Sequence, residues 1–142
     1  MPSRRVRVVA CLVICLGLAG CAGKVIVAGE VSVLVSERPS GGMDALKSGP
    51  LEVVGGCLGS GGSVIVWPYG TKVVDEDPLT IEIPDTGTFT LGDQVQVGGG
   101  FVLEHTSEEQ PLGSFEAGGV TAPRACAEHD VFLAFTGVPA TS

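Results

Sequence analysis

The chain has 142 residues, 44% of them hydrophobic, and it carries 8 basic and 16 acidic residues, which gives a formal net charge of −8. This length fits a single domain with its own core. The excess of acids argues against nucleic acid as a partner, because its phosphates would be repelled. No stretch shows helical periodicity over three turns, so a helical fold is not expected either.

The N-terminal segment has the three parts of an export signal. Arg4, Arg5 and Arg7 make a basic start, residues 8–18 are apolar, and small residues follow. As a helix, residues 8–20 would span roughly 20 Å at ~1.5 Å per residue, whereas a hydrocarbon core is about 30 Å thick. A cleaved signal peptide is therefore expected, with the general secretory and twin-arginine export routes both open.

The end of this segment, "LAGC" at residues 18–21, resembles the lipobox of bacterial lipoproteins. The resemblance implies that residues 1–20 are a signal peptide and that Cys21, the first mature residue, carries a lipid on its sulfur. It also implies a protein that is lipid-anchored in the cell membrane and faces outward. A plain signal peptide, or an uncleaved anchor with a chance cysteine, is the alternative.

The mature part is more acidic than the whole chain. Loss of residues 1–20 removes three arginines and no acid, which leaves 5 basic and 16 acidic residues and a formal net charge of −11. Such a charge favours solubility and would repel anionic lipid head groups. We therefore expect the membrane to be contacted through the lipid anchor alone, and an unknown protein or small molecule to be the other partner.

The mature chain shows the short, alternating strands of a β protein. Residues 21–50 are expected to form the lipidated N-terminus, a strand at "VSVLV" and a loop from 38 to 50. Residues 51–142 are expected to form the β-barrel domain, with strands such as "SVIVW", "LTIEI" and "VFLAF" and a long loop at 105–125. Interior glycines mark places where a sheet can bend and close. We predict an all-β fold, a small OB-like barrel of about five main strands plus an N-terminal strand.

The cysteines are compatible with an exported protein. Of the five, Cys11 and Cys15 lie in the predicted signal peptide and Cys21 takes the lipid. Cys57 and Cys126 remain as one pair, and an oxidising compartment favours a disulfide between them. Two buried free thiols or a metal site are the alternatives.

A second resemblance covers residues 51–136. This stretch contains "GGCLG", "VIVWPYG", "LGDQVQVGGGFV" and a late cysteine before an apolar strand. In this order the motifs resemble a group of small, functionally uncharacterised actinobacterial proteins that are secreted or lipid-anchored. The resemblance implies a shared β domain with the same disulfide, and it implies no activity.

Few residues suggest a binding site or chemistry. Trp67 and Tyr69 are the candidate ligand-binding residues, because aromatic rings at a strand end can stack on a sugar or a peptide; the alternative places Trp67 in the core. Cys126 and His129 have a tolerable metal-ligand spacing, but Cys126 is needed for the disulfide. Neither a metal nor a cofactor is expected, and a site of His105 and His129 with Glu104 or Glu108 is the alternative. No catalytic residues are predicted.

These observations favour a non-catalytic binding or structural module at the cell envelope. The alternative is a cell-envelope enzyme or an accessory subunit of one. A deep pocket lined by two or more acids, or by both histidines, would favour that alternative.

Overall fold

The computed structural model describes residues 22–39, 42–105 and 113–136. Within them the chain forms twelve strands and one short helix, α1 (Arg124–Ala127), which confirms the prediction of a β fold. No helix in the described ranges is long and apolar enough to cross a membrane. The predicted signal peptide and Cys21 lie outside the described residues.

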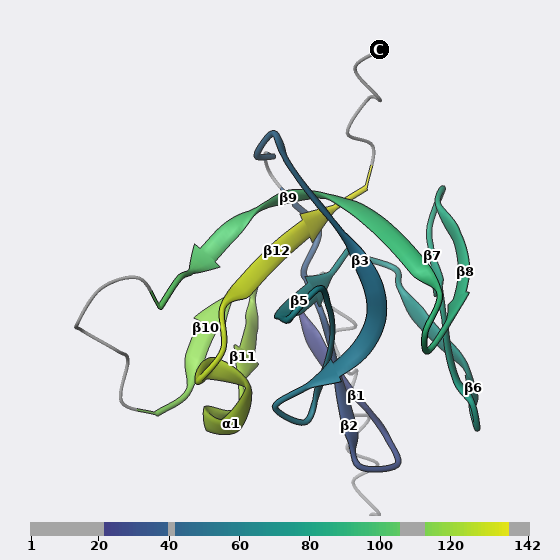
Figure 1. Cartoon of the computed structure of the whole chain (residues 1–142). Helices are drawn as coiled ribbons and strands as arrows, with labels where there is room; N and C mark the ends of the chain where they lie inside the picture. Colours follow the sequence, from purple (N-terminus) through teal and green to yellow (C-terminus); the bar gives the residue numbers. More distant parts are fainter. Residues whose placement is uncertain (1–21, 40–41, 106–112, 137–142) are drawn as a thin grey trace, which may run out of the picture.

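The strands form a large sheet, a small sheet and a hairpin (Figure 1). The large sheet contains seven strands: β1 (Lys24–Ala28), β2 (Val31–Val35), β3 (Ala45–Val54), β4 (Cys57–Ser60), β5 (Ser63–Trp67), β9 (Gln94–Leu103) and β12 (Val131–Phe135). The small sheet contains β6 (Lys72–Glu76), β7 (Leu79–Ile83) and β8 (Gly87–Thr90). The hairpin consists of β10 (Phe115–Ala117) and β11 (Val120–Ala122).

The strand pairings of the large sheet include a cycle that begins and ends at β3. β3 pairs antiparallel with β4, and β4 pairs antiparallel with β5. β5 pairs parallel with β12, β12 pairs antiparallel with β9, and β9 pairs antiparallel with β3. β2 lies parallel to β4 and β5, and β1 follows it at the end of the sheet. The N-terminal strands therefore belong to the same sheet as the strands after residue 50.

The central strand β5 separates two parts of the core. All five of its residues are buried, because alternate side chains point to opposite faces and both faces are covered. Ile65 and Trp67 belong to a first cluster, to which β7 of the small sheet contributes Ile81. Val64 and Val66 belong to a second cluster, which the β10–β11 hairpin and α1 help to cover.

Cys57 and Cys126 form a disulfide, as predicted, with their Cα atoms 5.8 Å apart. Cys57 is the first residue of β4, and α1 carries Cys126 into the second cluster, where both residues are buried. The bond joins the large sheet to the segment between β11 and β12. It excludes the two alternatives, a pair of free thiols and a metal site at this pair.

Two segments predicted as loops contain regular structure. The predicted loop at 38–50 ends early, because residues 45–50 are the first half of β3 and pair with β9. Gly49 and Pro50 favour turns locally, but the pairing of a ten-residue strand outweighs that preference. Pro50 lies where β3 changes its partner from β9 to β4, and a missing N–H is tolerated at such an irregularity. The predicted loop at 105–125 contains the β10–β11 hairpin and the start of α1.

Gly99 allows β9 and β12 to approach each other closely. A methyl group on its Cα would overlap the carbonyl oxygen of Leu133 on β12. We expect Gly99→Ala to lower the free energy of unfolding by about 1–3 kcal/mol, because one of the two strands would have to move. Urea unfolding of the variant and the wild type measures this loss.

Gly42→Ala is the matched control for that substitution. Its methyl group would meet only the Phe135 ring, at an ordinary distance of 3.8 Å. We expect the free energy of unfolding to change by no more than about 0.5 kcal/mol. A Gly99→Ala variant that is as stable as the wild type would contradict the observed register between β9 and β12.

Candidate functional site

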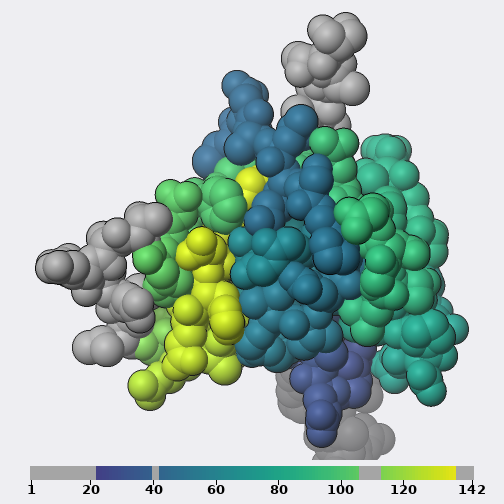
Figure 2. All heavy atoms as spheres, viewed as in Figure 1, coloured from purple at the N-terminus to yellow at the C-terminus, as the bar shows by residue number. Residues whose placement is uncertain are grey.

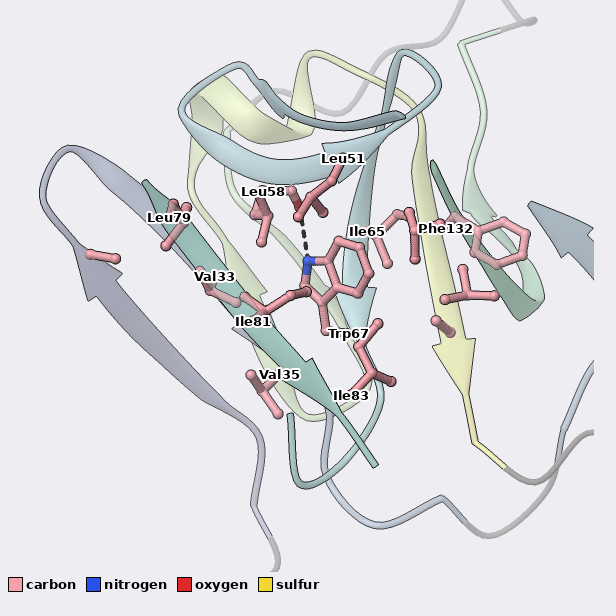
Figure 3. Close-up of a cluster of buried hydrophobic side chains, with 14 residues drawn as sticks. Val33, Val35, Leu51, Leu58, Ile65, Trp67, Leu79, Ile81, Ile83 and Phe132 are labelled. Carbon is pink, nitrogen blue, oxygen red and sulfur yellow. Dashed lines mark hydrogen bonds between the residues drawn. The ribbon is translucent and has the colours of Figure 1, made fainter. Parts of the chain in front are cut away.

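The structure separates the two aromatic residues that the sequence suggested as ligand-binding. Trp67 is 0% exposed, which confirms the alternative that places it in the core and makes its role as a stacking surface wrong. Figure 3 shows Leu51, Ile81 and Ile83 gathered around its ring, and its Nε1–H donates to the carbonyl oxygen of Leu58 at 3.1 Å. The ring is enclosed because the small sheet covers this face of β5.

Tyr69, two residues further on, remains available at the surface. It is 38% exposed, and the guanidinium carbon of Arg38 lies 5.1 Å from the centre of its ring. A cation over an aromatic face is attracted by the quadrupole of the ring, which is negative on that face. The contact holds the segment after β2 close to the segment after β5.

An open pocket of about 450 Å³ lies beside this contact. Its size falls in the range of small-molecule sites, about 300–1,000 Å³. It is formed where the segment after β2, the β10–β11 turn, the end of β12 and the residues before β3 meet. The lining residues are Ser36, Glu37, Arg38, Pro39, Gly42, Met43, Gly118, Leu133 and Phe135.

Backbone hydrogen bonds fix the polar wall of the pocket. The Ser36 N–H donates to the Trp67 carbonyl oxygen at 2.9 Å, and the Glu37 N–H donates to the Gly118 carbonyl oxygen at 2.7 Å. Gly118 has a φ of +59°, which a tight hairpin turn requires and glycine adopts without strain. A Cβ at Gly118 would also lie only 2.8 Å from the Leu133 side chain. The turn can therefore pack directly against β12.

Ser36 places an unsatisfied hydroxyl in this wall. The residue is 2% exposed, and its Oγ makes no hydrogen bond with any group of the described residues. Leaving a buried hydroxyl without a partner costs about 1–3 kcal/mol, so this group is an exception among buried polar atoms, most of which are hydrogen-bonded.

Part of the pocket lining is apolar. Leu133 and Phe135 come from β12, and Met43 packs over the backbone of Gly100. Carboxylate and guanidinium groups from the segment after β2 complete the lining. The pocket therefore suits a molecule with an apolar body and a polar group.

The stability of a Ser36→Ala variant tests whether the hydroxyl lacks a partner. We expect the free energy of unfolding to rise by about 1 kcal/mol, because the substitution removes a buried group without a hydrogen bond. Ser60→Ala is the matched control, since the Ser60 Oγ is also buried without a partner among the described residues but does not line the pocket. Chemical denaturation measures both variants. A loss of stability in Ser36→Ala alone would show that its hydroxyl is already bonded.

The two histidines lie away from this pocket. The Nε2 of His105 is 3.0 Å from the Ala127 carbonyl oxygen, and the His105 backbone N–H donates to Oδ1 of Asp130 at 2.8 Å. The ring of His129 lies beside Gly55, near the disulfide. No group of three or more His, Cys, Asp or Glu residues in the described part of the chain could hold a metal ion.

The pocket lining has the groups for binding and lacks a catalytic pair. Glu37 is the single carboxylate among the nine lining residues, and neither histidine is one of them. Activation of the Ser36 hydroxyl as a nucleophile would need a base within hydrogen-bond reach, and no described residue hydrogen-bonds to it. Comparison of the chain with protein-family models, with curated protein sequences and with solved structures found no match.

Proposed function

We propose that the protein is a lipid-anchored extracytoplasmic β module that binds a small ligand, or a short segment of a partner, without catalysing a reaction. The pocket beside Ser36 is the observation that carries the binding role, because it joins a hydroxyl without a partner to an apolar wall. The basic start, short apolar stretch and "LAGC" of residues 1–21 support the anchor at Cys21.

We further propose that the large sheet is an OB-like barrel. The closed order β3–β4–β5–β12–β9 supports this, since an OB barrel has five strands, a three-strand meander and one parallel pair. The small sheet packs on one part of its core, and β2 adds an N-terminal strand beside β4 and β5. In this arrangement the pocket lies outside the barrel core, at the rim that faces the β10–β11 hairpin.

The anchor is tested by replacing the residue that would carry the lipid. We expect Cys21→Ala to abolish labelling by a clickable fatty acid and to leave an unprocessed precursor, because both steps need the cysteine sulfur. In-gel fluorescence of cells fed the fatty acid measures the labelling, and the size of the band measures processing.

Cys15→Ala is the matched control, because Cys15 lies in the predicted signal peptide and is removed with it. That variant should be labelled and processed like the wild type. Continued labelling of Cys21→Ala would remove the proposed lipid site, whatever the pocket binds.

A further inference from the structure

We propose that β1 is a second membrane contact, which lies in the head-group layer of the anchoring membrane through Val25 and Val27. This inference rests on the proposed lipid at Cys21. It replaces the expectation that the lipid anchor alone touches the membrane. Three features of the described residues support it: the distance from the anchor, the exposed side chains and the composition of the strand.

The first feature is the short distance between the proposed anchor and the folded domain. Gly23 is packed so closely on the β10–β11 turn that a Cβ on it would lie 2.7 Å from the Gly119 carbonyl carbon and oxygen. The chain is therefore held to the domain from residue 23 onwards. Two residue steps span at most about 7 Å, so a lipid on Cys21 would bring Gly23 and the start of β1 to the membrane surface.

The second feature is the apolar outer side of β1. Ile26 and Ala28 point inward, to the first core cluster. Val25 and Val27 point the other way and are 42% and 66% exposed, as the alternation of a strand requires. β1 is also the last strand at its end of the large sheet. Its two valines are thus the exposed large apolar side chains nearest in sequence to the proposed lipid.

The third feature is the composition of β1 itself. β1 contains Lys24 and no acid, and the first acid of the mature chain is Glu30, in the turn after β1. Lysine beside apolar residues is the composition of segments that lie in a membrane interface, where the ammonium group meets lipid phosphates. The strand itself therefore adds no acidic group to the contact.

An environment-sensitive dye on β1 tests this contact. The processed, lipidated protein carrying Val27→Cys is labelled with NBD and reconstituted into phosphatidylcholine vesicles. We expect the NBD emission to shift to the blue and to be quenched by a doxyl group placed near the lipid head group. Leu46→Cys on β3 is the matched control, because Leu46 is 63% exposed and Val27 is 66% exposed. Figure 2 shows the first residues of β3, in blue, at the opposite end of the molecule from the purple β1–β2 hairpin.

Flotation of the vesicles separates the two ways in which the inference can fail. Protein that floats with the vesicles, with the dye at residue 27 as exposed to water as the dye at residue 46, overturns the contact and leaves the anchor in place. Protein that does not float overturns the anchor and the contact together. Val25→Cys provides a second labelling site if Val27→Cys fails to form the disulfide, and it should give the same blue shift and quenching.

Discussion

Removal of the Cys57–Cys126 disulfide should lower the melting temperature of the domain by about 10 °C or more. The bridge joins residues 69 positions apart, and the loop-entropy estimate for that length is about 4 kcal/mol. For a domain of roughly this size, each kcal/mol corresponds to several degrees in melting temperature. The double variant Cys57→Ala/Cys126→Ala, followed by circular dichroism during heating, measures the loss.

A reducing agent provides the control for that comparison. Wild-type protein that is unfolded, reduced and refolded in the reducing agent should melt near the temperature of the double variant, while the agent should leave the double variant unchanged. Both cysteines are buried in the second core cluster, so an alkylating reagent should not modify them in the native oxidised protein. Equal melting temperatures for the oxidised and reduced wild type would contradict a stabilising role of the bridge.

Trp67→Ala should be the most damaging single substitution in the first core cluster. The residue is completely buried, and truncating a buried tryptophan to alanine costs about 3–5 kcal/mol through lost transfer energy and the cavity that remains. The Leu58 carbonyl oxygen would also lose its donor, the Trp67 indole N–H. Guanidinium chloride unfolding of the variant measures this loss.

Tyr69→Ala is the matched aromatic control. Because Tyr69 is partly exposed and its ring contact is with Arg38, its truncation should cost about 1 kcal/mol. If Trp67→Ala and Tyr69→Ala lost the same small amount of stability, Trp67 would not be the core residue that the structure shows.

Several strands could be predicted from the sequence because their side chains alternate strictly. In "LTIEI", residues 79–83, Leu79, Ile81 and Ile83 are buried while Glu82 is exposed, as a strand with one covered face requires. The first half of β3 could not be predicted in this way. Its turn-forming residues gave the stronger local signal, and the pairing with β9 that overrides it is a property of the whole sheet.

The sequence leaves the location of Trp67 open between a stacking surface and the core for a related reason. Pro68 follows it and marks the end of a strand, a position that both alternatives allow. In the structure β5 pairs with strands on both sides, and the small sheet covers the face that carries the indole. A local signal such as Pro68 shows where a strand ends, but it does not show which other elements cover the strand.

The pocket could not be predicted from the sequence, because the residues that line it are far apart in the chain. Ser36 follows β2, and Leu133 lies on β12, the last strand of the chain. β5 brings them together, since it pairs parallel with both β2 and β12. A serine at a strand end has no local feature that distinguishes a buried hydroxyl without a partner from an ordinary surface serine.

The mass of the N-terminal peptide tests the lipid anchor most directly. Trypsin cleaves after Lys24, so processed protein extracted from its own membranes should release a peptide of residues 21–24. We predict that this peptide begins at Cys21 and carries the added mass of a diacylglyceryl group on the cysteine sulfur. An unmodified Cys21, or a peptide in which Gly20 is still joined to Cys21, would contradict the account.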